Sequence, residues 1–458
     1  MSGGADRRLW NPAAEAMSAD EMRALQLARL KRQLAYNHAN GPFHRERFKA
    51  AGARPEDIHS FSDFAQLPLM DKEAHRQAQA RGLEEFGDPF ALFGCAPREK
   101  IVRINATSGT TGEPTLYGLT AHDVGVVNEM HARKYWRAGM RPGGVMLQAL
   151  SLSMFTGGLP LSQGIQHMGA CVVPVGVEGG TARVIQFARL TKPEALIATP
   201  SFARHLIEEC EKLAGVPARA LGIKRFFSAG EAGGGDPEIR AMLAQGLGAR
   251  IFDHTGGGHA FHAISCDQPP GEFKGLHLVS EDHCLLELVD PDSKAGVEIT
   301  DGARGEMVWT FLGWEGGPFM RYAMGDVVEI ATDPCPCGQP GPRIRIIGRA
   351  DDMLIVKGVN VYPQAIAGVI AGFRPRITGA FRIVLGKAGP SVSPPLRIRL
   401  ERGEALAAQD LGALEKEMLE RFRAELHIRP RLEWTDPRSL PREAMKTRLV
   451  VIEARPGG

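Results

Sequence analysis

The fold is decided by the stretch from VMLQAL (145–150) to ARIFDHTG (249–256), which also holds ACVVPVG (170–176), EALIATP (194–200) and IKRFFSAG (223–230). Each of these runs is short and apolar, and each leads into small or polar residues. Helical patterns lie between them, such as TARVIQFARLT (181–191) and PEIRAMLAQGL (237–247). Strands that alternate with helices in this way predict parallel β-α units, and therefore an α/β fold.

The residues that follow these runs are candidates for a binding site. In parallel α/β sheets, ligands bind beyond the carboxyl ends of the strands. Those ends carry Thr199–Ser201, Ser228–Glu231 and His254–Gly256. Ordinary loop residues are the alternative, but their repeated placement after strands favours one shared crevice.

The flanking parts of the chain have different patterns. Residues before about 100 read as charged helices, and Ser18 followed by Glu21 predicts a capping box. Between 275 and 347 the pattern turns to alternating strands, as in EMVWTFL (306–312). The last part mixes strands with an amphipathic helix, which is typical of a small α+β domain. We expect a large domain (1–347), a small domain (348–458) and a boundary at 348–352.

Length, composition and charge exclude several classes of protein. A chain of 458 residues exceeds one ordinary core, so two or more domains are expected. Hydrophobic residues at 43% and charged residues at 24% are globular values. A net charge of +2 gives no support for a nucleic-acid or membrane-surface role. Without a spanning apolar run or a signal-peptide core, we expect a cytoplasmic protein.

The run NATSGTTGEPT (105–115) concentrates glycines and hydroxyl groups in one short segment. Gly109 and Gly112 allow a close backbone approach to a ligand, and successive N–H groups can form an anion-binding concavity. A phosphate cradle is one interpretation, and a polar surface turn is the other. The usual P-loop pattern fails, because Glu113 stands where that pattern has lysine.

Further motifs follow this run in a fixed order. They are MFTGG (154–158), Ala-Gly-Glu (229–231), GLH (275–277), RYAMGD (321–326), GRADD (348–352), DDMLIVKGVNVYP (351–363) and a late lysine, Lys446. The ordered set resembles the adenylate-forming (AMP-binding) acyl-CoA ligase superfamily, and within it the phenylacetate–CoA ligase branch. The resemblance covers nearly the whole chain after about Leu27.

The resemblance implies an activity and its cofactors. Such an enzyme joins a carboxylic acid to ATP, with Mg²⁺, and forms an acyl-adenylate and pyrophosphate. A mobile C-terminal domain then rotates, and the acyl group passes to the thiol of CoA. Two alternatives stay open: loading of a carrier-protein phosphopantetheine thiol, and a non-catalytic homologue that only binds nucleotide or acyl groups. A homodimer is a further implication of the resemblance.

The resemblance also assigns roles to residues. It gives the β- and γ-phosphates to Ser108, Gly109, Thr110, Thr111 and Gly112. Asp326 accepts hydrogen bonds from the ribose hydroxyls, Arg349 holds the ribose or phosphate region, and Thr255 contacts the α-phosphate. Lys446 is the adenylation lysine, because a positioned cation stabilises the developing charge. Arg442 is the competing cation, and Asp351 is the implied hinge of the C-terminal domain.

Two positions depart from the family pattern. Family members usually carry Tyr-Gly-x-Thr-Glu where this chain has FDHTG (252–256), so Gly256 replaces a glutamate thought to help hold Mg²⁺. Glu231 or Asp253 is expected to supply the missing carboxylate, since Mg²⁺ needs few protein ligands beside phosphates. Glu113 replaces a common lysine and adds negative charge near the phosphates.

The implied acyl pocket includes residues from three segments: Leu152, Phe155, Gly157, Gly230, His254 and Gly256. The expected substrate is an aromatic or arylacetic acid. His254, His259 and His262 are pocket groups, metal ligands or solvated loop residues. The last is the commonest state of scattered histidines.

Seven cysteines, odd in number and mostly scattered, argue against a disulfide scaffold. Cys335 and Cys337 form a Cys-x-Cys knuckle, which favours zinc. The resemblance adds Cys266 and His277, and the four would form a structural site within a β-rich subdomain at about 260–347. His283 is a rival ligand, and Cys284 is a weaker one.

Overall fold

The computed structural model describes residues 9–107, 114–154, 157–231, 233–257, 259–269, 272–350, 352–356, 359–387, 389, 391–392, 394–406, 408–441 and 449–453. The chain divides into two compact units. The first holds the chain up to Met324 together with Glu329–Arg345, and the second holds Gly325–Val328 and the chain from Ile346 onward. The division thus falls just before 348–352, and the short segment with Asp326 groups with the second unit.

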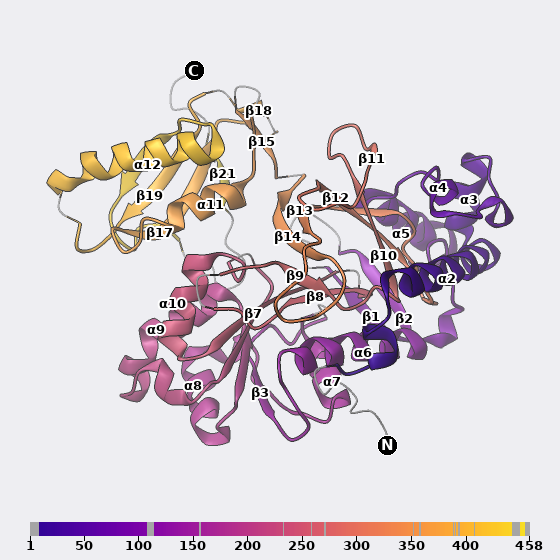
Figure 1. Ribbon diagram of the computed structural model, residues 1–458, viewed down its shortest axis with the longest axis horizontal. Helices are drawn as coiled ribbons and strands as arrows, with labels where there is room; N and C mark the ends of the chain where they lie inside the picture. The colour runs from indigo at the N-terminus through magenta and orange to yellow at the C-terminus, as the bar shows by residue number, and fades with distance from the viewer. Residues whose placement is uncertain are drawn as a thin grey trace. The chain divides into compact units, whose positions relative to one another are not determined.

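The central part of the first unit alternates strands and helices, as its sequence predicts (Figure 1). The strands are β3 (Val145–Gln148), β4 (Cys171–Pro174), β5 (Ala195–Ala198), β6 (Arg225–Ser228) and β7 (Arg250–Gly257). The helices are α6 (Ala121–Arg137), α7 (Leu159–His167), α8 (Gly180–Thr191), α9 (Pro200–Ala214) and α10 (Pro237–Leu247). The strands pair in parallel in the order β4-β3-β5-β6-β7, which confirms the expected α/β fold.

Local signals start and stop the helices at the ends of these strands. Thr199 accepts a hydrogen bond from the backbone N–H of Phe202, and Pro200 takes the first position of α9. The side chain of Asp236 caps α10 in the same way. Gly215 and Gly248 end these helices in the left-handed conformation that glycine adopts without steric cost. The turns after β5 and β6 are therefore fixed in place.

Apolar side chains cover both faces of the parallel strands. On one face Leu196 and Phe226 pack with residues of α8, α9 and α10. On the other face Ile197 and Phe227 pack with residues of α6 and α7. A sheet buried on both faces reads as continuous apolar runs, and this explains why the strands were recognisable in the sequence.

The sheet continues beyond β7 with further strands. They are β8 (Phe261–Ser265), β9 (Leu276–Leu278), β10 (Cys284–Val289), β11 (Gly296–Val297), β12 (Arg304–Phe311), β13 (Tyr322–Ala331) and β14 (Arg343–Arg349). β7 pairs with β8, and β8 pairs with β9, both in antiparallel register. The strand expected at 306–312 is thus present as β12.

The N-terminal part of the first unit is mainly helical. Its helices are α1 (Pro12–Glu15), α2 (Ala19–Asn40), α3 (Pro42–Ala50), α4 (Phe61–Phe64) and α5 (Lys72–Phe86). Ser18 and Glu21 form the predicted capping box at the start of α2. A separate antiparallel pair, β1 (Ile101–Ala106) and β2 (Leu116–Thr120), leads into α6.

The second unit is an α+β structure, as expected for the C-terminal part. It contains β15 (Leu354–Val356), β16 (Val359–Val361), α11 (Pro363–Ala371), β17 (Ile377–Leu385), β18 (Ser391–Val392), β19 (Arg397–Arg402), α12 (Leu411–Leu426), β20 (Arg431–Thr435) and β21 (Val450–Ile452). Four strands form a sheet in the order β20-β19-β17-β21. Ile383 and Ile398 of this sheet pack with Met418 and Phe422 of α12.

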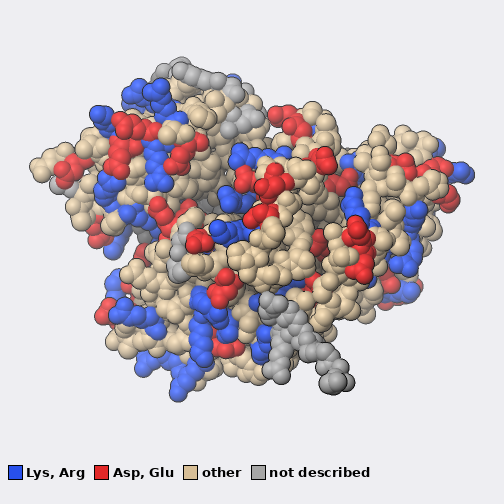
Figure 2. Space-filling model, in the orientation of Figure 1, with Lys and Arg blue, Asp and Glu red and all other residues tan. Residues whose placement is uncertain are grey.

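Charged side chains of both signs are interspersed over the face shown in Figure 2. This distribution agrees with the small net charge of +2. Within the described ranges, no helix has both the length and the hydropathy needed to cross a bilayer.

Candidate active site

The segments that follow β3, β5 and β6 meet at the carboxyl edge of the parallel strands. The N–H of Ala149 donates to the carbonyl of Ile197 at 2.9 Å, and that of Ala229 to Ala198 at 3.2 Å. The N–H of Ser201, at the start of α9, donates to Oε1 of Glu231 at 2.5 Å. Glu231 therefore lies at the edge where the sequence placed it, although its carboxylate already has a backbone partner.

Gln148 fixes the glycines of the expected acyl pocket, a role that the sequence did not suggest. Its Nε2 donates to the carbonyls of Gly157 and Gly158, at 3.1 and 3.0 Å. Its Oε1 accepts from the hydroxyl of Ser162 in α7. The sequence did contain a signal: Gln148 is a polar residue at the end of an apolar strand. A buried amide needs hydrogen-bond partners, so it was a candidate for holding a neighbouring segment. Leu152 and Gly157 are half-buried beside this anchor.

The run rich in glycine and hydroxyl groups connects β1 to β2. Ser108, Gly109, Thr110, Thr111 and Gly112 lie outside the described residues, as do Glu113 and Phe155. The two ends of the connection are joined: the N–H of Thr107 donates to the carbonyl of Thr115 at 3.1 Å. The N–H of Ala106 donates to the carbonyl of Met154 at 3.3 Å. The base of the expected phosphate loop is thus bonded to the acyl-pocket segment.

Side chains of β7 alternate between its two faces. Asp253 and Thr255 share one face, and His254 and Gly256 share the other. Burial raises the pKa of Asp253 to about 7, although Arg240 and the hydroxyl of Ser228 act in the opposite direction. A carboxyl group that is half-protonated near neutral pH holds a cation less well than an ionised one. Glu231 is therefore the better candidate for the missing magnesium carboxylate.

Gly256 is packed against an imidazole ring. A Cβ atom at this position would lie 2.8 Å from Nδ1 of His262 and 3.1 Å from its Cε1. Contacts this short do not occur in well-packed proteins, so a side chain at 256 requires His262 to move. The ring of His262 therefore occupies the room that the usual glutamate would need. This exchange gives a physical reason for the departure from the family pattern.

Of the three alternatives for His254, His259 and His262, the structure excludes solvated loop residues. All three are buried, with exposed fractions of 8%, 2% and 0%. The reason is that β7 extends to Gly257 and pairs with β8, which places the three imidazoles inside the unit. Burial lowers the pKa of His259 to about 3, and the charge of Arg103 adds to this effect. These side chains are neutral groups of the interior.

Helix α6 adds two buried groups that the sequence did not identify. Lys134 is 1% exposed and His131 is 2% exposed. Burial alone lowers the pKa of Lys134 to about 7. The sequence did contain a signal for their burial. His131 lies four residues after the buried Val127, and Lys134 lies three residues after His131, so all three fall on the stripe of α6 that faces the sheet.

The two residues assigned to the ribose lie together in the second unit. Nη1 of Arg349 donates to Oδ1 of Asp326 at 2.9 Å. The N–H of Ala350 also donates to the carbonyl of Gly325, which joins the GRADD and RYAMGD motifs. Lys446, Arg442 and Asp351 lie outside the described residues.

A compact group of metal-ligand side chains is formed by Cys266, His277, Cys335 and Cys337. Their ligand atoms all lie within 4.8 Å of one another. Sγ of Cys266 is 3.6 Å from Sγ of Cys335, and Sγ of Cys337 is 3.4 Å from Nε2 of His277. A tetrahedral zinc with Zn–S bonds of 2.3 Å has ligand separations of roughly 3.8 Å, so the donor set fits zinc.

The rival ligands are not part of this group. His283 instead lies 3.5 Å from Oδ2 of Asp282, and Cys284 is buried in β10. A hydrogen bond with Cys266, and a second one with His277, lower the pKa of the Cys337 thiol. The thiolate is the form that binds metals.

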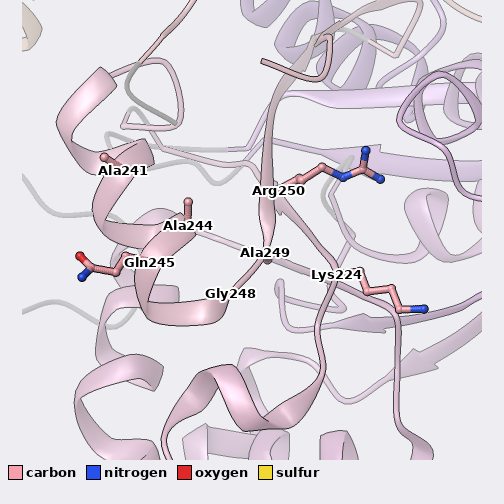
Figure 3. A pocket seen from close by; sticks show the side chains of 7 residues that line it. All are labelled: Lys224, Ala241, Ala244, Gln245, Gly248, Ala249 and Arg250. Carbon is pink, nitrogen blue, oxygen red and sulfur yellow. The ribbon is translucent and has the colours of Figure 1, made fainter. Parts of the chain in front are cut away.

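The first unit also has a hollow of about 510 Å³ at the opposite end of the strands (Figure 3). It is lined by Lys224, Ala241, Ala244, Gln245, Gly248, Ala249 and Arg250. Lys224 precedes β6 and Arg250 begins β7, so the hollow lies at the amino ends of these strands. It is therefore not the crevice at the carboxyl edge.

Comparisons with known proteins agree with this geometry. Residues 358–455 match the model of the AMP-binding enzyme C-terminal domain. Phenylacetate–coenzyme A ligase of Thermus thermophilus is 34% identical, over 86% of this chain and 84% of that protein. The enzyme of the same name from Escherichia coli is 32% identical, over 84% of each chain. A crystal structure of 2-hydroxyisobutyryl-CoA ligase, in the postadenylation state in complex with R3-HIB-AMP, superposes with a TM-score of 0.87 and 29% identity, over 99% of this chain and 94% of that one.

The fold, the carboxyl-edge segments and these similarities define an adenylate-forming enzyme. The chain belongs to the phenylacetate–coenzyme A ligase family. It is an AMP-forming acid–thiol ligase, which activates a carboxylic acid with ATP as an acyl-adenylate and then forms a thioester with CoA.

Restoring the family glutamate should damage the protein. In Gly256→Glu, the new side chain meets His262, and we expect the free energy of unfolding to fall by about 1–3 kcal/mol. Denaturant unfolding followed by circular dichroism measures this change. In a His262→Ala background the same Gly256→Glu change should cost much less, because the ring is gone; the comparison is with His262→Ala alone, since removing a buried ring itself lowers stability. A single variant as stable as the parent would show that the two positions do not compete for space.

Proposed function

We propose that the acid activated by this ligase is aromatic or arylacetic and that it binds at the carboxyl edge of β3, β5, β6 and β7. The observation that carries the location is the bonding of the segments after β3, β5 and β6 to one another, which brings Gly157, Gly230 and Glu231 to one edge. The names of the relatives from T. thermophilus and E. coli support phenylacetate-like acids.

In the first step, a carboxylate oxygen of the acid attacks the α-phosphorus of ATP. The bond from that phosphorus to the oxygen bridging to the β-phosphate breaks, and pyrophosphate leaves. Ser108–Gly112 restrain the leaving phosphates with backbone N–H groups and hydroxyls. Thr255 donates a hydrogen bond to an α-phosphate oxygen, and Lys446 stabilises the charge that builds there. Asp326 accepts hydrogen bonds from the ribose, and its partner Arg349 holds that carboxylate in place.

In the second step, the thiolate sulfur of CoA attacks the carbonyl carbon of the acyl-adenylate. The bond from that carbon to the phosphate oxygen breaks, and AMP leaves. Asp351 is the proposed hinge about which the C-terminal domain turns between the two steps. Mg²⁺ would be held by the phosphates and by Glu231, whose charge complements that of the metal. The carrier-protein acceptor and the homodimer stay predictions.

The adenylation step is tested by acid-dependent release of pyrophosphate, measured with a panel of carboxylic acids. The parent should release pyrophosphate with at least one aromatic or arylacetic acid. Lys446→Ala should lower the rate by about 100- to 1,000-fold, because a group that stabilises charge in the transition state is lost.

The matched control is Lys416→Ala, which removes an exposed lysine of α12 and should leave the rate unchanged. The assignment is contradicted if none of the acids supports pyrophosphate release. It is also contradicted if Lys446→Ala releases pyrophosphate at the rate of the parent. Supplying CoA in one reaction and a phosphopantetheinylated carrier protein in another identifies the thiol acceptor.

We also propose that Cys266, His277, Cys335 and Cys337 hold a structural zinc ion. The separations of their ligand atoms match a zinc tetrahedron, and four protein ligands leave no coordination position open for chemistry. Cys266 follows β8 and His277 lies in β9, so the metal would tie these strands to the loop that precedes β14.

Metal analysis of protein purified without chelator should find about one zinc per chain. Cys335→Ser should lose the metal and unfold at lower temperature, because the metal no longer links the strands. Cys171→Ser is the control, since Cys171 is exposed and stands apart from the group. Equal zinc content in the parent and in Cys335→Ser would refute the site.

A further inference from the structure

Five polar side chains converge between helix α6 and strands β7 and β8. They are His131, Lys134 and Tyr135 of α6, His254 of β7 and His262 of β8. The five are buried, with exposed fractions between 0% and 8%. His254 belongs to the expected acyl pocket, and Gly256 of that pocket faces the ring of His262. The group, called here the α6–β8 polar cluster, therefore adjoins the carboxyl edge.

The members of this cluster lie close to one another. The ring centroids of His131 and His262 are 4.9 Å apart, and those of Tyr135 and His254 are 6.0 Å apart. Nζ of Lys134 is 5.6 Å from the centre of the Tyr135 ring. Burial, followed by the charge of Lys134, lowers the pKa of His131, His254 and His262 well below the usual value. Lys134 thus lies within electrostatic reach of all three imidazoles.

Much of the hydrogen-bonding capacity of this cluster is unused. Both ring nitrogens of His131 have no partner within the described ranges, and the same is true of Nδ1 of His254 and of His262 and of the hydroxyl of Tyr135. Among the described residues, Nζ of Lys134 has the ring of Tyr135 as its neighbour and forms no ion pair with a carboxylate. Native interiors rarely leave buried polar atoms unpaired, and they rarely bury a lysine without an anion.

A purely structural role does not account for this arrangement. An apolar residue in place of Lys134 would avoid the cost of burying an amino group that has no hydrogen-bond acceptor among the described residues. The neighbouring apolar residues Phe227 and Ile264 show that the interior here is otherwise hydrophobic. The cluster is therefore better suited to a ligand that brings acceptor oxygen into the acyl pocket.

We propose that the α6–β8 polar cluster reads an oxygen substituent on the acyl chain, so that the preferred substrate is a carboxylic acid carrying a hydroxyl or a second carboxylate. The side-chain amino group of Lys134 donates to this oxygen, and a negatively charged oxygen would favour its protonated form. The neutral imidazoles of His131 and His254 donate or accept around it. This inference rests on the proposed function, because it concerns the acid that the ligase activates. It separates the chain from a ligase built for unsubstituted phenylacetate.

The test compares acids of matched size. Pyrophosphate release is measured with ring-hydroxylated phenylacetates, with the corresponding ring-methylated isomers and with 4-carboxyphenylacetate. In the parent, kcat/KM for the best hydroxy acid or the dicarboxylate should exceed that for its methyl counterpart by about 10- to 100-fold, as for a hydrogen bond to a charged group. Whichever of the two, the hydroxy acid or the dicarboxylate, gives the higher kcat/KM identifies the recognised group as a hydroxyl or a carboxylate.

Lys134→Met keeps the side-chain length and removes the charge. It should lower this preference by about 10-fold or more, without lowering the unfolding temperature. Lys31→Met, on the exposed face of α2, is the control and should keep the preference of the parent. A parent that prefers the methylated acids, or a Lys134→Met variant with the same preference as the parent, would overturn the inference.

Calorimetric binding of the same acids separates this inference from the proposed function. If no acid gives pyrophosphate release, the proposed function fails. The calorimetric binding of the acids still tests whether the α6–β8 polar cluster recognises the oxygen substituent. Tighter binding of the oxygenated acids to the parent than to Lys134→Met would support it. Equal binding to both would overturn it.

Discussion

The parallel backbone pairing of β3, β5, β6 and β7 is the constraint on which the site in the first unit depends. Because these strands run in one direction, their carboxyl ends lie along one edge, and the chain turns there into α7, α9 and α10. The caps at Thr199 and Asp236 fix two of those turns. Bonds from Gln148 and Glu231 then join the segments to one another. The described residues proposed for the nucleotide in the first unit all lie at this carboxyl edge, and none lies at the amino ends of the strands.

Gly256, where this chain departs from the family pattern, adjoins the α6–β8 polar cluster. Where its family has a glutamate, the structure has an imidazole packed on a glycine. His262 is in turn close to His131, which lies one helical turn before Tyr135 on α6. The absence of a glutamate at position 256 and the buried amino group of Lys134, whose pKa is about 7, both make the region less negative. We infer that the two features belong together, since an oxygen-bearing substrate would supply the negative charge that the chain itself lacks.

The sequence predicted those features that depend on neighbouring residues. The apolar runs became strands because a sheet covered on both faces needs no alternation, and the Ser18–Glu21 pair formed its cap. Motif order was enough to place the chain in its family. The cluster could not be read in this way, because Lys134 and His262 are separated by more than a hundred positions and meet only through the pairing of β7 with β8. The alternatives for His254, His259 and His262 stayed open for the same reason. Their burial follows from a strand that extends beyond its apolar part to Gly257.

The central claim is that the acyl-adenylate forms at the carboxyl edge of the parallel strands, with its acyl chain directed toward α6. A crystal structure with a non-hydrolysable acyl-sulfamoyl-adenosine, made from a hydroxylated arylacetic acid, tests this claim most directly. We predict that the adenosine lies beside Gly230 and Thr255, and that the substituent oxygen lies within hydrogen-bonding distance of Nζ of Lys134. Density for the analogue in the hollow lined by Ala244 and Gln245, or an acyl chain that leaves Lys134 without a contact, would contradict the account.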